Sequence, residues 1–361
     1  MRGAVLAHAG DDRLVIRDDI TLISDVGPHE VRVRIRATGI CHSDLSAIDG
    51  VLPAPIPFIP GHEAAGDVVA VGGAVQSVSP GDRVILTLIP PCGKCRFCLN
   101  GQANLCDSVV NPFDTPPRYE AGGEPLFSLG GISSWVEEVI LPEQGVVKIA
   151  SDVPYDVAAI VGCAVTTGVG AVLNTAKLAP GSTVAVFGCG GVGMSVIQGA
   201  QLAGASAVLA IDLSEEKLKL AQTFGATHVA TPVQASGVGD AIHDGLGFDV
   251  TFEAIGRAGT IRDAYDAARR GGTTVVVGAG GMEDMVEFSA FELFYFERTI
   301  KGSVYGSADV RRDFPLLLDL WRAGRLDLQA LITRHLKLDD INDGIDALRA
   351  GREIRQVVEF A

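Results

Sequence analysis

Apolar and charged side chains alternate along the first part of the chain. Residues 29–37 read His-Glu-Val-Arg-Val-Arg-Ile-Arg-Ala, which is typical of a strand with one buried face and one face in water. Residues 66–71 and 83–88 form further apolar runs, and the turn-forming sequence Ser-Pro-Gly-Asp at 79–82 lies between them. Short strands and turns dominate the chain up to Pro154, which predicts a β-rich domain.

The pattern changes after Pro154, where apolar strands alternate with helical periodicity. Residues 157–173 predict a helix, and a helix at 215–224 is expected to begin after Ser214, whose hydroxyl caps the first turn. Other predicted strands are 183–187, 207–211, 248–252 and 273–277, with a helix at 191–203. This alternation predicts a parallel, doubly wound sheet. The pattern shifts again near Ile300, and a strand is predicted at 355–360.

Composition and charge narrow the possible functions. The chain has 361 residues, enough for two domains, and 47% hydrophobic residues, enough for a large core without disulfides. A net charge of −15 argues against nucleic acid and anionic membranes as partners. The sequence shows no secretory leader and no uninterrupted apolar stretch of membrane-spanning length. Because its cysteine spacing is typical of metal sites, we expect a reducing compartment and a cytoplasmic protein.

Four of the seven cysteines lie close together in the sequence. They follow the pattern C-x2-C-x2-C-x7-C at Cys92, Cys95, Cys98 and Cys106. Thiolates at this spacing can surround one metal ion from a single turn, and a tetrahedral zinc held by four thiolates is a closed, structural site. Loose surface thiols or disulfides are the alternative interpretation, which a cytosolic chain disfavours.

Two further cysteines and a histidine are widely separated. Cys41 and Cys163 lie on either side of His62, which stands in a Gly-His-Glu sequence. Two thiolates and one imidazole would leave the fourth position of a zinc ion open for substrate. The spacing alone leaves a second interpretation open, in which these are unrelated core residues, because a buried cysteine usually behaves as a small hydrophobe.

The last cysteine, Cys189, stands in a glycine-rich turn. Gly188, Gly190 and Gly193 fit the dinucleotide-binding pattern, and the turn follows an apolar strand and opens a helix. Asp212 ends the next predicted strand, where an acid binds the adenosine ribose diol and disfavours a 2′-phosphate. The turn therefore predicts NAD rather than NADP, with a simple packing turn as the alternative.

Together these motifs resemble the zinc-dependent medium-chain alcohol dehydrogenases along essentially the whole chain, including the class III-like and the aryl- or nicotinoprotein-type enzymes. The matching segments are residues 39–44, 60–63, 92–106, 162–163 and 188–193, with Asp212 and Lys217. The resemblance implies an α/β fold with a GroES-like β-rich catalytic domain at 1–155. It further implies a Rossmann NAD-binding domain with a doubly wound parallel sheet at 156–303, and a C-terminal return to the catalytic domain at 304–361.

The resemblance also implies roles for individual residues. Two zinc ions and NAD are the expected cofactors, with Cys41, His62 and Cys163 holding the catalytic zinc and the four-cysteine cluster holding the structural one. Asp44 would fix the His62 tautomer, Glu63 would lie behind the metal, and Ser43 would bind the substrate oxygen and start a proton relay. The implied NAD contacts are His42, Gly188, Gly190, Gly191, Val192, Gly193, Asp212, Lys217 and Arg355.

Alignment with the family implies an apolar substrate pocket. Its lining would be Leu52, Leu88, Trp135, Ala279 and Val304, a set without charge that suits a primary aliphatic, allylic or aromatic alcohol or its aldehyde. Some of these residues could equally pack the core.

The chain departs from family patterns in two places. Ser46 stands where many relatives have a histidine that finishes the relay, so the end of the relay is open. The stretch between Cys106 and Gly130 looks shorter than in glutathione-dependent formaldehyde dehydrogenases. Arg118 lies in that stretch and could meet a substrate carboxylate or serve only the surface.

Three alternatives to a dissociable-NAD alcohol dehydrogenase remain at this point. They are an S-hydroxymethyl-thiol (formaldehyde) dehydrogenase, a nicotinoprotein alcohol dehydrogenase with tightly bound NAD(H), and a zinc-stapled NAD-binding protein without chemistry. The intact Cys41, His62, Cys163 and Ser43 argue against the last. The resemblance also implies a homodimer or homotetramer, paired through a strand near residues 299–304. The sequence alone selects neither the exact substrate, nor the physiological direction, nor the oligomer.

Overall fold

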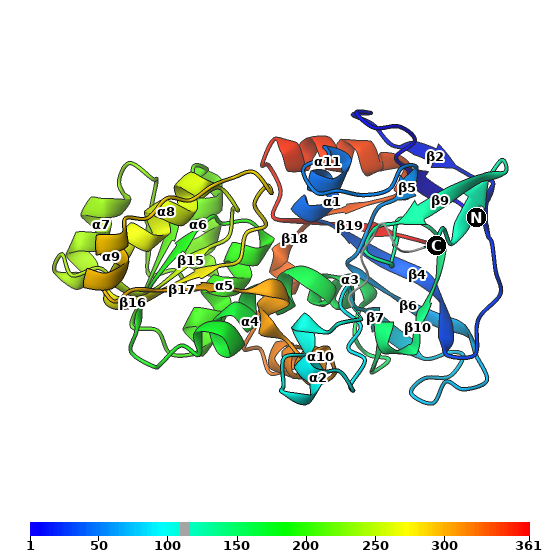
Figure 1. The fold of residues 1–361 in the computed structure, drawn as a ribbon, viewed down its shortest axis with the longest axis horizontal. Helices are drawn as coiled ribbons and strands as arrows, with labels where there is room; N and C mark the ends of the chain where they lie inside the picture. The colour runs from blue at the N-terminus through cyan, green and yellow to red at the C-terminus, as the bar shows by residue number, and fades with distance from the viewer. Residues whose placement is uncertain (109–115) are drawn as a thin grey trace. The chain divides into compact units, whose positions relative to one another are not determined.

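The computed structural model describes residues 1–108 and 116–361, drawn in Figure 1. The chain forms two compact units. The first contains Met1–Cys163, Asp309–Asp319 and Leu328–Ala361, and the second contains Ala164–Ala308 and Leu320–Asp327. The C-terminal segment therefore rejoins the unit in which the chain begins.

A seven-stranded sheet organises the first unit. Its order is β11-β7-β6-β4-β19-β18, with β10 also paired to β4. The strands are β4 (Glu30–Ile40), β6 (Ala64–Val71), β7 (Arg83–Leu86), β10 (Glu138–Pro142), β11 (Val146–Ile149), β18 (Ile332–Leu336) and β19 (Arg355–Glu359). β19 pairs antiparallel with β4, with Gln356 opposite Ile40. This pairing places the C-terminal strand beside the residues that lead into Cys41.

Smaller elements surround this sheet. The remaining strands are β1 (Gly3–Val5), β2 (Val15–Arg17), β3 (Ile20–Leu22), β5 (Phe58–Ile59), β8 (Tyr119–Ala121) and β9 (Glu124–Ser128). The helices are α1 (His42–Ile48), α2 (Arg96–Leu99), α11 (Ile341–Arg349) and the larger part of α10 (Val310–Arg322), whose residues after Asp319 belong to the second unit. Short 3-10 turns lie at Ala103–Leu105, Glu143–Gly145, Gln329–Leu331 and Leu338–Asp340. Alternate residues of β4, including Val31, Val33 and Ile35, point into one hydrophobic core, as the sequence alternation predicts.

The second unit contains a six-stranded parallel sheet. Its order is β14-β13-β12-β15-β16-β17, so the strand order reverses direction at β12 and β15. The strands are β12 (Thr183–Phe187), β13 (Ala207–Ile211), β14 (His228–Ala230), β15 (Phe248–Glu253), β16 (Ala268–Val276) and β17 (Thr299–Gly302). The helices are α5 (Gly191–Leu202), α6 (Glu215–Thr223), α7 (Ala235–His243), α8 (Ala258–Ala267) and α9 (Ala290–Tyr295), with a 3-10 turn at Val304–Ser307. This is the strand order of the doubly wound dinucleotide-binding fold, as predicted.

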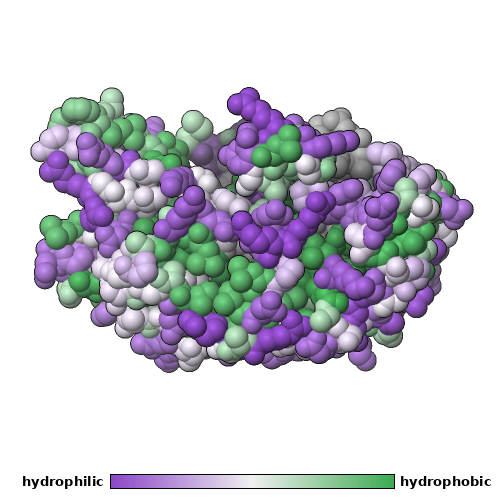
Figure 2. Space-filling view, turned by 90° about the horizontal axis from the view of Figure 1, so that it is seen from below, coloured by the Kyte–Doolittle hydropathy of each residue, from purple (hydrophilic) through white to green (hydrophobic). Residues whose placement is uncertain are grey.

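One long apolar helical segment runs from Tyr155 to Ala176. It is long and apolar enough to cross a membrane, but 89% of its most apolar window is buried inside the protein, as in a core helix of a soluble protein. It consists of α3 (Tyr155–Ile160), a π-helical stretch (Val161–Val165), α4 (Thr166–Gly170) and a second π-helical stretch (Ala171–Ala176). On the face shown in Figure 2, hydrophobic and hydrophilic residues are interspersed.

The elements predicted from the pattern agree with the structure at most positions. The strands at 183–187 and 207–211 have the predicted bounds, and Ser214 caps α6 by accepting a hydrogen bond from Lys217 N at 3.3 Å. The strand predicted at 83–88 ends at Leu86. The helix predicted at 157–173 is interrupted by π-helical turns. The apolar periodicity of the sequence does not predict these π-helical turns. Each turn adds one residue to the helix and so shifts the apolar face only locally.

Candidate metal centres and nucleotide-binding turn

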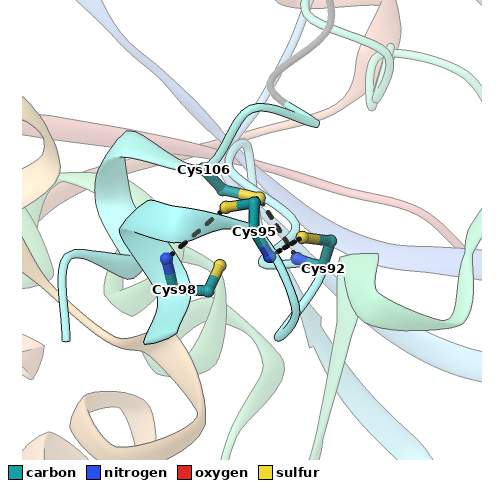
Figure 3. Close-up of side chains that lie close together, drawn as sticks. All are labelled: Cys92, Cys95, Cys98 and Cys106. Atoms are coloured by element: carbon teal, nitrogen blue, oxygen red, sulfur yellow. Dashed lines mark hydrogen bonds between the residues drawn. The ribbon is translucent and has the colours of Figure 1, made fainter. Parts of the chain in front are cut away.

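The four closely spaced cysteines form one cluster in the first unit. Cys95 caps α2, Cys106 follows a 3-10 turn, and the four sulfur atoms all lie within 4.8 Å of one another (Figure 3). Backbone amides converge on the sulfurs: Cys92 N donates to Cys106 Sγ (3.2 Å), Cys95 N to Cys92 Sγ (3.3 Å), and Cys98 N to Cys95 Sγ (3.4 Å). This arrangement matches a closed four-thiolate zinc site.

The thiols of this cluster differ in pKa, because they differ in burial and in hydrogen-bond partners. Burial raises the pKa of Cys106, but the Cys92 amide and the Ser108 hydroxyl and amide outweigh burial and lower that pKa to about 6. Burial and the neighbouring Cys106 and Cys95 raise the pKa of Cys98 to about 12. Four thiols packed this closely cannot all ionise by themselves, so a cation is needed to hold four thiolates together.

The widely separated residues meet in a second, buried cluster. Cys41 lies just before α1, His62 and Glu63 follow β5, and Cys163 lies in the π-helical stretch before α4. One ligand atom of each of these four residues lies within 4.8 Å of the others, and all four residues are buried. Cys41, His62 and Cys163 are therefore not unrelated core residues, because they meet at one site.

Asp44 orients the histidine of this cluster. Its Oδ1 lies 2.9 Å from His62 Nδ1 and also accepts a hydrogen bond from Gly61 N at 3.0 Å, while its Oδ2 accepts one from Cys41 N at 3.0 Å. Burial lowers the pKa of His62, but the Asp44 carboxylate outweighs burial and raises it well above the usual value. His62 Nε2 is buried and has no hydrogen-bond partner among the described residues. An imidazole held through Nδ1 with Nε2 unpartnered is the usual arrangement of a zinc-ligating histidine.

A buried ion pair lies beside the same cluster. Arg355 Nη2 on β19 lies 3.6 Å from Glu63 Oε1, and both side chains are almost fully buried. Burial raises the pKa of Glu63, the Arg355 guanidinium opposes it, and the net value is about 7. A hydrogen bond from Cys163 is the largest cause that lowers the pKa of Cys41, followed by the charge of Arg355. The site therefore favours a thiolate at Cys41 and suits a divalent cation that accepts sulfur and nitrogen ligands.

The remaining predicted residues of this site lie nearby. Ser43 is in the first turn of α1, with its Oγ 3.9 Å from Cys41 Sγ, and His42 is the first residue of that helix. Arg355, predicted to approach a pyrophosphate, is 3% exposed and also donates to Ile40 O at 3.2 Å. Its partnership with Glu63 was not expected from the sequence, because nothing in the strand pattern of residues 355–360 indicates what faces them.

The glycine-rich turn opens α5 in the second unit. Gly188 has φ +94°, a left-handed conformation that favours glycine, and Gly190 is the residue before the helix. Gly191, Val192 and Gly193 form the first turn of α5. Asp212 follows β13, and its Oδ2 accepts a hydrogen bond from Cys189 N at 2.7 Å. The acid and the turn therefore meet at the carboxyl end of the sheet, where dinucleotides bind in this fold.

Lys217 and the second oxygen of Asp212 belong to the same region. Asp212 Oδ1 accepts a hydrogen bond from Ser214 N at 2.9 Å. Lys217 lies in the first turn of α6, three residues after its cap. The hydrogen bonds of Asp212 hold the loop after β13 in place. The sequence pattern predicted the helix start at Ser214 but not these contacts.

The five predicted pocket residues are divided between the units. Leu52, Leu88 and Trp135 lie in the first, Ala279 and Val304 in the second. Trp135 is 0% exposed in the hydrophobic core, and its indole N–H donates to Gly39 O at 3.1 Å, so it has a packing role. Leu88 also packs against this core, whereas Val304 is 54% exposed.

Arg118 has a partner within the protein. Its Nη2 lies 2.8 Å from Glu30 Oε1, in a pair that is about three-quarters buried. This places Arg118 in a partly buried ion pair, which favours a structural role over a contact with a substrate carboxylate.

Comparison with known proteins identifies two family domains. An alcohol dehydrogenase GroES-like domain matches residues 27–151, and a zinc-binding dehydrogenase domain matches residues 191–322. The chain is 38% identical over 378 residues to S-(hydroxymethyl)glutathione dehydrogenase of Paracoccus denitrificans, covering 99% of both chains.

Solved structures show the same fold. An alcohol dehydrogenase zinc-binding domain protein from Burkholderia ambifaria superposes with a TM-score of 0.93 at 31% identity, covering 100% of this chain and 98% of the other. Benzyl alcohol dehydrogenase from Acinetobacter calcoaceticus superposes with a TM-score of 0.91 at 29% identity, covering 100% and 99%.

These matches confirm the predicted family, fold class and enzyme activity, and they agree with zinc and NAD as the cofactors. The chain belongs to the zinc-dependent medium-chain alcohol dehydrogenases, a family of NAD-dependent oxidoreductases.

Proposed function

We propose that this enzyme interconverts primary, largely apolar alcohols and their aldehydes with NAD as hydride acceptor. The observation that carries the proposal is the buried cluster of Cys41, His62 and Cys163, in which His62 Nε2 is unpartnered among the described residues. These three residues would hold a zinc ion, whose positive charge would acidify a substrate hydroxyl, and bound NAD would supply the hydride acceptor.

The protein's own side chains would hold the site and move the proton. Ser43, beside Cys41, is the proposed first acceptor of the substrate hydroxyl proton. Asp44 keeps the His62 ring in one tautomer by accepting from its Nδ1–H. Glu63 and Arg355 form the buried charge pair behind these ligands. Solvent isotope effects on kcat test the path of the proton beyond Ser43, because Ser46 stands where many relatives have a histidine.

The proposed division of labour follows the domains. The first unit, close to the predicted range 1–155 with 304–361, would form the catalytic domain, and the second unit, close to the predicted range 156–303, would form the NAD-binding domain. The units differ from the predicted bounds in placing 156–163 in the first unit and 304–308 and 320–327 in the second. In the latter, Asp212 would bind the adenosine ribose diol and the turn from Gly188 to Gly193 the pyrophosphate, with Lys217 nearby. The acid would exclude a 2′-phosphate, which favours NAD over NADP.

The substrate class rests on charge. Arg118, the cation considered for a substrate carboxylate, is paired with Glu30 at 2.8 Å. The proposed pocket residues Leu52, Leu88, Ala279 and Val304 carry no charge, which suits an apolar alcohol. A second candidate is an S-hydroxymethyl-thiol adduct, favoured by the 38% identity to the Paracoccus denitrificans enzyme of that name.

We propose a homo-oligomer that pairs through β17. All four residues of this edge strand are exposed, and helix α9 presents Phe291 (65% exposed) and Phe294 (78% exposed) in the same unit. An unpaired edge strand with exposed aromatic residues favours association with a second copy. The spacing of the cysteines supports a cytoplasmic location.

A steady-state assay at 340 nm tests the proposal. Zinc-replete protein is mixed with benzyl, allylic and aliphatic alcohols and with S-hydroxymethylglutathione, each with NAD and separately with NADP. NAD reduction by apolar alcohols supports the proposal, whereas turnover of the thiol adduct alone supports the second candidate.

If no NADH accumulates with any substrate, an artificial electron acceptor is added. Turnover only with that acceptor identifies a nicotinoprotein, with NAD(H) that stays bound. No turnover under either condition contradicts the proposed dehydrogenase activity and favours a binding protein.

A further inference from the structure

A fully buried carboxylate ends one of the central strands of the second unit. Glu253 is the last residue of β15 and is 0% exposed. Its Oε1 accepts three hydrogen bonds, from Ile255 N (3.0 Å), Gly256 N (2.8 Å) and Thr260 Oγ1 (2.7 Å). Its Oε2 has no hydrogen-bond partner among the described residues. Burying a carboxylate is costly, so this one is expected to have a specific role in the loop that it organises.

The backbone of the same residue connects three loops. Glu253 O accepts hydrogen bonds from Val277 N (2.8 Å) and Gly278 N (3.0 Å), which lead out of β16. The next residue, Ala254, donates its N–H to Phe187 O at 2.9 Å, at the end of β12. Glu253 and Ala254 together therefore join the ends of β12, β15 and β16 at one edge of the sheet.

The turn after β15 packs closely against two neighbouring loops. A Cβ atom added at Gly188 would lie 2.6 Å from Ile255 Cγ1, and one added at Gly256 would lie 2.6 Å from the Ala279 carbonyl carbon. Such contacts are shorter than real Cβ contacts, so the turn from Ala254 to Gly256 has one position between its neighbours. The Glu253 carboxylate lies behind this turn and accepts hydrogen bonds from two of its amides, Ile255 N and Gly256 N.

Strand order indicates what this turn faces. The proposed pyrophosphate turn follows β12, and Asp212, the proposed ribose ligand, follows β13 on one side of it. β15 lies on the other side of β12, with Glu253 directly opposite Phe187 in the ladder. A dinucleotide that lies along the carboxyl edge, with its adenosine over β13, must extend its nicotinamide half across the ends of β15 and β16.

We propose that Glu253 is a positioning residue for the nicotinamide half of NAD. By accepting from Ile255 N, Gly256 N and Thr260 Oγ1, its carboxylate holds the turn after β15 as the surface against which the nicotinamide riboside binds. This inference rests on the proposed function, in which the second unit binds NAD. It predicts that changing Glu253 weakens binding of the nicotinamide half of NAD and leaves binding of the adenosine half unchanged.

Calorimetric titration of the full-length protein with NADH and with ADP tests the inference, because ADP lacks the nicotinamide riboside. In Glu253→Ala, the affinity for NADH is expected to fall about tenfold, the loss expected when a charged hydrogen-bond acceptor is removed, while the affinity for ADP stays within about twofold. Glu253→Gln is the matched control. It keeps an oxygen for the two amides and changes only the unpartnered atom, so its NADH affinity should stay within about threefold of the wild type.

A role confined to stability would weaken NADH and ADP equally or leave both unchanged, and either result overturns the inference. If wild-type protein binds neither ligand, the NAD-binding assignment itself fails, which is a separate outcome. If Glu253→Ala does not fold, Thr260→Val decides, because it removes one donor to Oε1 and keeps the side-chain shape. It should weaken NADH about threefold and leave ADP unchanged, and equal effects on both ligands again overturn the inference.

Discussion

The two cysteine clusters of this enzyme use similar ligands but are assembled differently. The four-cysteine cluster lies within residues 92–106, and its cysteines are only partly shielded, apart from the buried Cys106. The second cluster takes Cys41, His62 and Cys163 from distant segments, and each is buried. A local loop can close around a metal by its own turns, whereas the second cluster exists only when the first unit has folded. The first is therefore expected to support stability and the second to support chemistry.

The largest expected effect is a loss of activity when a ligand of the second cluster is removed. Cys163→Ala removes one of three proposed ligands and should lower kcat/KM by about 10⁴-fold or more, because groups that act as one catalytic unit fail together. Zinc content, measured by atomic emission, should fall from two ions per chain toward one. Activity near the wild-type level would remove Cys163 from the site.

The converse change tests the four-cysteine cluster. Cys98→Ala should lower the free energy of unfolding by about 4 kcal/mol or more, because loss of a structural metal is among the most destabilising single changes. Thermal unfolding followed by circular dichroism measures this loss. The folded fraction should keep most of its kcat, and a variant that is equally stable but inactive would reverse the two assignments.

Asp44→Asn asks how far the second cluster depends on its supporting carboxylate. Asp44 accepts from Cys41 N, Gly61 N and His62 Nδ1, so an amide NH2 in its place must face one of these donors. The affinity for the catalytic zinc, measured by competition with a chelator, should fall about 10–100-fold. The zinc of the four-cysteine cluster serves as the internal control, and equal loss of both ions would indicate general unfolding.

The smallest effect is expected for the corresponding support in the local cluster. Ser108 Oγ lies 3.0 Å from Cys106 Sγ and donates to Pro90 O at 2.9 Å. Ser108→Ala should cost about 1 kcal/mol of unfolding free energy, the usual net value of a hydrogen bond, with zinc retained. If Ser108→Ala lowered the free energy of unfolding as much as Cys98→Ala, the four-cysteine cluster would also depend on the residues around it.

Local patterns predicted a large part of this protein. The alternation in residues 29–37 placed β4, and the strand–helix alternation after Pro154 placed β12, α5, β13 and α6 within a few residues. The four-cysteine spacing predicted a cluster that the structure contains. The partner of Arg118, the core position of Trp135 and the carboxylate of Glu253 were not predictable in the same way, because each is defined by residues distant in sequence.

The sequence by itself determined which groups could act and which of them lie within reach through local turns. Fifteen residues hold Cys92 to Cys106 within a distance that a few turns can close, so spacing alone predicts their meeting. Only the tertiary structure decided that Cys41 meets Cys163 and that Arg355 faces Glu63. The chain between such groups is long, so many distances between them are possible in the unfolded state. Burial of the β4 core and the pairing of β19 with β4 select the arrangement in which they meet.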